Sequence, residues 1–191
     1  MRNLLLFAVA IIAGCASSPP PADWQLASLA ALNAFKQNYL RGDTRAAQID
    51  FERARAELRS TGRVDLVARA ELLRCAVRAS SLEFDGCPGF EALRADASAE
   101  ELAYAEYLAG RAQRPSPDEA FARLVFAGVQ LNSGRATPED ISAAVDIASA
   151  QGWRRPLLAW LGVQEKRAEA AGDRDALERI RRRIALVAGG S

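Results

Sequence analysis

The sequence lacks histidine altogether, and lysine occurs only at Lys36 and Lys166. The absence of histidine excludes imidazole general acid–base catalysis, nucleophiles activated by histidine, and the usual histidine ligands of zinc. The sequence also contains no glycine-rich phosphate loop, no Gly-x-Ser-x-Gly nucleophile turn and no cluster of metal-ligand residues. We therefore predict no cofactor and no metal, and carboxylate chemistry remains possible.

An excess of charge is also missing, because 25 lysines and arginines face 24 acids. A balanced chain has no general attraction to nucleic acid, so we predict no nucleic-acid partner. Runs of β-branched residues are scarce, whereas alanine, leucine and arginine are frequent. The 191 residues therefore predict one all-α domain of about eight antiparallel helices. Apolar periodicity and turn residues place these helices at 24–41, 44–60, 63–82, 99–111, 117–132, 138–151, 154–171 and 173–187.

The chain has no apolar run long enough to span a membrane, but it has a shorter one at its start. Arg2 precedes apolar residues from Leu4 to Ile12. This run falls short of the roughly 20 residues of a membrane span and is typical of the core of a secretory signal peptide. It ends in Ile12-Ala13-Gly14-Cys15, an aliphatic residue, two small residues and a cysteine. The segment resembles the lipobox of bacterial lipoproteins.

The lipobox resemblance implies cleavage between Gly14 and Cys15 and attachment of diacylglyceryl and palmitate to Cys15. In Gram-negative members of the family an aspartate after the cysteine favours the inner membrane, whereas Ala16 and Ser17 stand here. The resemblance therefore implies a lipid anchor in the outer membrane, with the domain facing the periplasm.

The same interpretation divides the chain into three segments. These are a signal peptide at 1–14, a lipidated proline-rich tether at 15–23 and a helical domain at 24–191. An extended tether of this length reaches only about 30 Å. The domain is therefore expected to work close to the membrane.

The helix expected over 63–82 is apolar on two opposite faces. The residues of one face are Leu66, Ala70, Leu73 and Val77, and those of the other are Ala68, Leu72, Cys75 and Ala79. A helix with two apolar faces must be covered on both sides. We therefore expect this helix to lie between other helices.

Three helices are expected to begin at a hydroxyl residue followed, three residues later, by an acid. The pairs are Ser98 with Glu101, Ser116 with Glu119, and Thr137 with Asp140. The hydroxyl oxygen accepts an otherwise unpaired N–H of the first turn, and the acid favours the positive end of the helix. This pattern predicts helix starts directly after Ser98, Ser116 and Thr137.

A Gly-Asp pair lies between the first two expected helices and recurs near the end of the chain. Gly42-Asp43 is followed by Ala47, Phe51 and Ala54, and Gly172-Asp173 is followed by Leu177. The first stretch resembles the centre of a tetratricopeptide repeat, in which a Gly-Asp turn joins two antiparallel helices packed through small and aromatic residues. The closing proline of that family is missing, and no period of about 34 residues relates the two copies. The resemblance implies an array of helical hairpins, and an irregular bundle is the alternative.

Cys75 and Cys87 remain once Cys15 is assigned to the lipid. In an oxidising compartment two such cysteines are expected to form a disulfide, worth about 3 kcal/mol in the chain-entropy model. Unpaired buried thiols and a redox-active pair are the alternatives. A helix continued to Phe84 would carry the chain about 14 Å past Cys75, whereas three extended residues return only about 10 Å. The helix is therefore expected to end near residue 80.

Trp153, Arg154, Arg155 and Trp160 lie close together around an expected helix start. Tryptophan and arginine are enriched at the energetic centres of protein interfaces. These four residues are therefore candidates for partner binding, and the alternative is that the indoles pack the core.

The final helix carries the densest run of cations, Arg179 and 181–183. Such a run could contact anionic headgroups or an acidic partner. However, Asp175 with Arg179 and Glu178 with Arg182 have the spacing of ion pairs within a helix. We therefore interpret the run as a solvated helix face.

These features favour a lipid-anchored, non-enzymatic adaptor or assembly factor that binds an envelope protein or peptide at the outer membrane. Helical-hairpin arrays present concave faces that suit such segments. One alternative is a peptidoglycan enzyme or accessory factor that uses carboxylates such as Glu100 with Glu101, or Glu139 with Asp140. Another is a purely structural lipoprotein. Two buried carboxylates facing one groove would favour the enzyme, and a surface without any groove would favour the structural protein.

Overall fold

The computed structural model describes residues 20–189, and this part of the chain contains helices and no strands. The elements are α1 (Asp23–Arg41), α2 (Thr44–Arg59), α3 (Val64–Ala79), α4 (Pro88–Glu91), the 3-10 turn η1 (Arg94–Asp96), α5 (Ala99–Leu108), α6 (Ala120–Asn132), α7 (Pro138–Ala150), α8 (Arg154–Ala171) and α9 (Arg174–Ala188). The all-α prediction is confirmed, and α4 is a short helix beyond the expected eight. Gly14, Cys15 and the signal peptide lie outside the described residues. No helix among residues 20–189 has both the length and the apolar character to cross a membrane.

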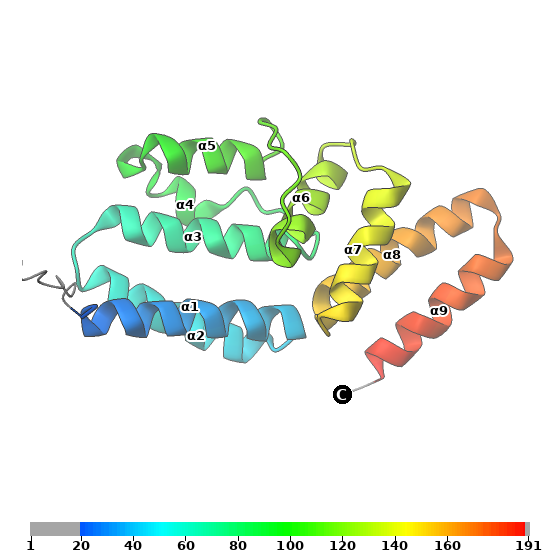
Figure 1. Cartoon of the computed structure of the whole chain (residues 1–191), viewed down its shortest axis with the longest axis horizontal. Helices are drawn as coiled ribbons and strands as arrows, with labels where there is room; N and C mark the ends of the chain where they lie inside the picture. Colours follow the sequence, from blue (N-terminus) through cyan, green and yellow to red (C-terminus); the bar gives the residue numbers. More distant parts are fainter. Residues whose placement is uncertain (1–19, 190–191) are drawn as a thin grey trace, which may run out of the picture.

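The helices follow one another through space in nearly the order of the chain (Figure 1). The α1–α2 hairpin packs against α3, and α5 lies on the other side of α3. Helix α6 contacts α3 and α7, and the series α7, α8 and α9 completes the far end of the molecule. A contact between α1 and α8 joins the two halves.

Two Gly-Asp turns share one geometry at opposite ends of this series. Gly42 ends α1 with φ +98°, and Gly172 ends α8 with φ +68°. This left-handed conformation is one that glycine adopts without a steric penalty. Each following aspartate accepts a hydrogen bond from a first-turn N–H, at 2.9 Å from Asp43 Oδ1 to Ala46 N and 2.9 Å from Asp173 Oδ1 to Ala176 N. The repeated sequence pair therefore forms the same tight connection between antiparallel helices twice.

Helix α3 separates two hydrophobic cores. Ala70 and Val77 belong to the larger core, which also takes residues from α1, α2, α6, α7 and α8. Ala68, Leu72 and Cys75 belong to the smaller core, which is built with α4, α5 and α6. The prediction that two apolar faces of this helix would be covered is confirmed.

Two of the three predicted capping pairs are present. Ser98 and Glu101 form a reciprocal capping box at α5, and Thr137 and Asp140 form another at α7. The third prediction was wrong, because α6 begins at Ala120 and its cap is Glu119, whose carboxylate accepts the N–H of Ala122 at 2.7 Å.

The residues before α6 explain why this helix does not start after Ser116. Pro117 does not prevent a helix start after Ser116, because Pro138 follows Thr137 in the same way at the start of α7. The Arg114 guanidinium lies 5.1 Å from the ring centre of Tyr104 and 5.5 Å from that of Tyr107. These contacts hold the segment against α5, and the helix begins only after it.

Candidate functional site

The sequence predicts a disulfide between Cys75 and Cys87, and this pairing requires the preceding helix to end near residue 80. Helix α3 ends at Ala79, as the pairing required, and the chain turns back through Leu82 in the left-handed conformation. The Cα atoms of Cys75 and Cys87 are 5.7 Å apart, and their sulfur atoms are at bonding distance. The predicted Cys75–Cys87 pair is therefore present.

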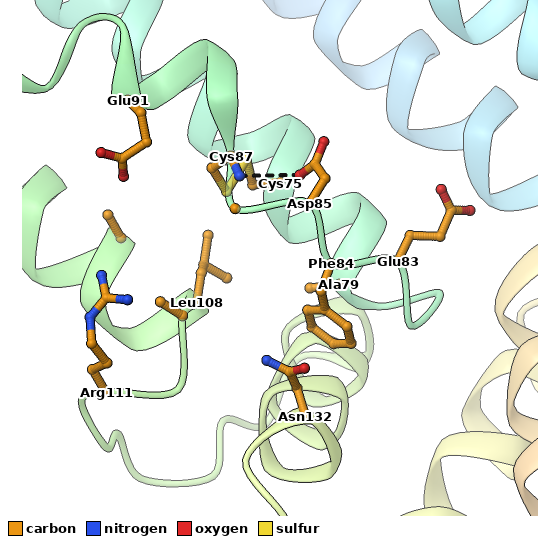
Figure 2. Close-up of a pocket in the computed structure, with 13 residues that line it drawn as sticks. Cys75, Ala79, Glu83, Phe84, Asp85, Cys87, Glu91, Leu108, Arg111 and Asn132 are labelled. Atoms are coloured by element: carbon orange, nitrogen blue, oxygen red, sulfur yellow. Dashed lines mark hydrogen bonds between the residues drawn. A yellow bond between two sulfur atoms is a disulfide. The ribbon is translucent and has the colours of Figure 1, made fainter.

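A cavity of about 270 Å³ lies beside this disulfide. Figure 2 shows Phe84 and Asn132 on one side of it, and Glu91 and Arg111 on another. The Asp85 carboxylate accepts the backbone N–H of Cys87 at 3.1 Å and also pairs with Arg78.

The charged groups around this cavity are already matched within the protein. Glu91 pairs with Arg94 at 3.0 Å, and Arg111 pairs with Glu106 at 2.5 Å. Cys75, Asp85 and Cys87 lie close enough together to suggest metal ligands, but both sulfurs are engaged in the disulfide. We therefore interpret the side chains around the cavity as structural support for the 80–87 loop.

The two candidate tryptophans lie in the core. Trp160 is fully buried, and its Nε1–H donates to the Ser80 carbonyl oxygen at 3.1 Å. Trp153 is buried edge-on against Phe121. The prediction that these indoles form a binding surface was wrong, and the alternative that they pack the core is correct.

The two candidate arginines are held at the junction of the halves. The Arg155 guanidinium donates to the Tyr39 carbonyl oxygen at 2.8 Å and to Thr44 Oγ1 at 2.5 Å, and it lies over the Tyr39 ring. Arg154 lies at the α1–α2 turn, where its Nε would be 3.7 Å from a Cβ added to Gly42. Both residues therefore connect the start of α8 to the first hairpin.

The buried carboxylates do not face a common groove. Glu71 is paired with Arg55 at 3.0 Å and with Arg74 at 2.9 Å. Glu101 accepts from Arg69 at 2.6 Å and from the Ser98 N–H at 2.8 Å. Burial opposes ionisation of Glu101, but these hydrogen bonds hold its pKa below the usual value. Both acids therefore have structural partners.

A wide groove remains between α7, α8 and α9, with a volume of about 520 Å³. We call it the α7–α9 groove. It is lined by Pro138, Ile141 and Ser142 from α7, by Gln164, Arg167, Ala168 and Ala171 from α8, and by Asp173, Ala176, Arg179, Ile180 and Arg183 at and within α9. Helices α7 and α9 both pack against α8 without packing extensively against each other. The groove is the space that this arrangement leaves open.

The cations of this groove have no ion-pair partner among the residues that the structure describes. Within residues 20–189, no carboxylate oxygen lies within 4.0 Å of the guanidinium nitrogens of Arg167, Arg179 or Arg183. The one aspartate in the lining, Asp173, accepts the N–H of Ala176. The groove is therefore positively charged.

The pairing of α9 differs from the sequence prediction. Arg182 pairs with Glu178 at 3.5 Å, as expected. Arg179 does not pair with Asp175, because the two side chains are not within ion-pair distance. Arg181 instead reaches α8, where it pairs with Glu165 at 2.7 Å and Glu169 at 2.6 Å. Arg181 and Arg182 of the basic run are thus paired with acids, whereas Arg179 and Arg183 line the groove.

Comparison of the chain with protein-family models, with curated proteins and with solved structures finds no match. The groove and its charges are therefore interpreted from their own geometry.

Proposed function

We propose that this protein is a lipid-anchored helical adaptor, or assembly factor, that holds a segment of a protein partner at the periplasmic side of the outer membrane. The signal-like start and the lipobox at Ile12 to Cys15 support the anchor. The α7–α9 groove is the observation that supports the binding function. Repeated Gly-Asp hairpin turns support the comparison with tetratricopeptide arrays, whose concave faces accept peptide segments.

The open groove contrasts with the packing at the other end of the domain. There α3 contacts both α1 and α2, so the three helices enclose their shared apolar surface. At the far end α7 and α9 leave a face of α8 uncovered between them. A segment lying in this space would complete a packing arrangement that the first three helices already have.

The carboxylate-enzyme alternative has less support. Glu101 and Asp140, which the sequence offered as candidate acids, are engaged as caps at the starts of α5 and α7. The buried Glu71 is held between two arginines. Hydrolysis by paired carboxylates needs an acid and a base facing one substrate, and the described residues offer no such pair in the groove.

The anchor is tested with Cys15→Ala in the full-length chain expressed in its native envelope. We expect loss of palmitate labelling and release from the membrane fraction, because one cysteine carries all the lipid. Retention of the variant in the membrane with unchanged labelling would contradict the lipoprotein assignment.

The adaptor function is tested by purifying the acylated protein from crosslinked envelopes and identifying bound proteins by mass spectrometry. A chain that lacks residues 24–191 serves as the control for the anchor alone. We expect one envelope protein in stoichiometric yield with the full chain only. Recovery of peptidoglycan fragments without a protein would favour the enzyme or accessory-factor alternative.

A further inference from the structure

We propose that the segment held in the α7–α9 groove is an acidic amphipathic helix of the partner, with carboxylates one turn apart facing Arg179 and Arg183. This inference rests on the adaptor function proposed above and specifies the chemistry of the partner. It is carried by the charge of the groove, by the spacing of its cations and by the apolar surface beside them.

The groove differs from the other described pockets in how its arginines are matched. Four further pockets have arginines in their linings, and each of these arginines has an acid or an aromatic ring as partner. They are Arg69, Arg74, Arg78, Arg111, Arg114 and Arg155. Only in the α7–α9 groove, among these five pockets of residues 20–189, do the arginines lack such a partner. The missing counter-charges are therefore expected on the occupant.

The cations define a spacing along the groove. Arg179 and Arg183 are four residues apart on α9, so they lie on one face and about 6 Å apart along the helix axis. Arg167 adds a third guanidinium from the α8 side. Aspartate or glutamate residues four apart on a partner helix have the same spacing as Arg179 and Arg183.

Apolar side chains lie next to the arginines of the groove. Leu186 follows Arg183 by three residues and is 79% exposed, which makes it the most exposed large apolar side chain of the described chain. Inside the groove Ile141 is buried, and Ile180 is partly covered. A partner helix with an apolar stripe beside its acids would cover these side chains, in the manner of helix-in-groove recognition.

The test places a photocrosslinking amino acid at Ser142, an exposed α7 residue of the groove, in the full-length acylated protein. The control position is Gln37, an exposed residue of α1 that lies outside the groove lining. After irradiation of native envelopes, mass spectrometry identifies the crosslinked segment. We expect a segment with acidic residues four apart at Ser142, and none of it at Gln37.

Charge variants then test how the segment is held. Arg179→Glu with Arg183→Glu is expected to lower the crosslinking yield at Ser142 by about tenfold or more, whereas the two lysine replacements retain most of it. High salt should lower the yield of the unmodified protein, because the contacts are at an open groove. The matched control is Arg174→Glu with Arg182→Glu, which changes the charge of α9 equally outside the groove lining and should leave the yield unchanged. Circular dichroism and thermal melting establish that both double variants remain folded.

Several outcomes would overturn the inference. They are a crosslinked segment without paired acids, a second copy of this chain at Ser142, or a yield that charge reversal in the groove does not change. If a partner copurifies but crosslinks only from other positions, the adaptor function stands and the acidic-helix inference fails. If no protein copurifies or crosslinks from any position, the proposed function itself fails.

Discussion

A close approach of α6 to the end of α3 offers a direct test of the fold. Gly128 lies in α6 against the last turn of α3, and it is buried. A Cβ added at this position would lie 3.1 Å from the carbonyl carbon of Ala79 and closer still to its oxygen. The Ala79 carbonyl belongs to the backbone and accepts the Leu82 N–H at 3.0 Å, so it cannot turn aside. Gly128→Ala therefore forces α3 and α6 apart.

The magnitude follows from comparing two opposing effects. Replacing glycine by alanine inside a helix favours folding by about 0.5–1 kcal/mol. Forcing an extra carbon into a packed interface typically costs about 1–3 kcal/mol. Since the collision here is with backbone, we expect a net loss of about 2 kcal/mol in the free energy of unfolding. For a domain of this size that lowers Tm by roughly 4–8 °C.

Gly162 in α8 is the matched control, because a Cβ added there would meet no atom within 4 Å. Gly162→Ala should therefore raise stability by about 0.5–1 kcal/mol. Urea unfolding followed by circular dichroism measures both variants on the same scale. If Gly128→Ala proved as stable as Gly162→Ala, the close contact between α3 and α6 would be wrong.

Further tests address the disulfide, the buried indole and the tyrosines. Reduction of Cys75–Cys87 should lower the free energy of unfolding by about 3 kcal/mol, and a urea midpoint that does not move would contradict the pairing. Trp160→Phe removes the donor to the Ser80 carbonyl and should cost about 1–3 kcal/mol, which urea unfolding would measure; a neutral result would place the indole elsewhere. Burial raises the pKa of all three tyrosines, that of Tyr107 to about 12. Their contribution to stability is therefore full below the unfolded pKa near 10 and is lost as pH rises through the folded values. Phenolate absorbance should appear near pH 10 in the denatured protein only, and its appearance there in the folded protein would contradict the burial.

Sequence periodicity predicted those features that depend on one helix or one turn. The two apolar faces of α3 follow from its own residues, and so do the paired Gly-Asp turns. The end of α3 near residue 80 followed from the span between Cys75 and Cys87, which is a constraint within one loop. These predictions needed no knowledge of how distant helices pack.

The features that the sequence did not predict depend on contacts between distant segments. Trp160 became a core residue because the end of α3 supplies a carbonyl acceptor 80 residues earlier in the chain. Arg179 lacks its expected partner Asp175, and its neighbour Arg181 pairs instead with acids of α8. The groove was therefore missed, although one signal was present: Arg179, Arg183 and Leu186 are spaced by four and three residues, as one stripe of a helix.

The cap of α6 shows how local rules compete. Ser116 and Glu119 are both suitable capping residues, and the sequence rule alone does not choose between them. Stacking of Arg114 on two tyrosines of α5 holds the preceding segment, which leaves Glu119 to cap the helix.

The start of α1 and the α7–α9 groove lie at opposite ends of the long axis of the molecule (Figure 1). Helix α1 has 19 residues and spans about 28 Å by itself, and α7 to α9 lie beyond its far end. With the proposed lipid at the other end of the tether, the domain would act as a spacer between the membrane and the groove as well as binding the partner segment. It would hold a captured segment at a set height above the bilayer, so tether length and domain length together would decide which parts of a membrane-associated partner can be reached.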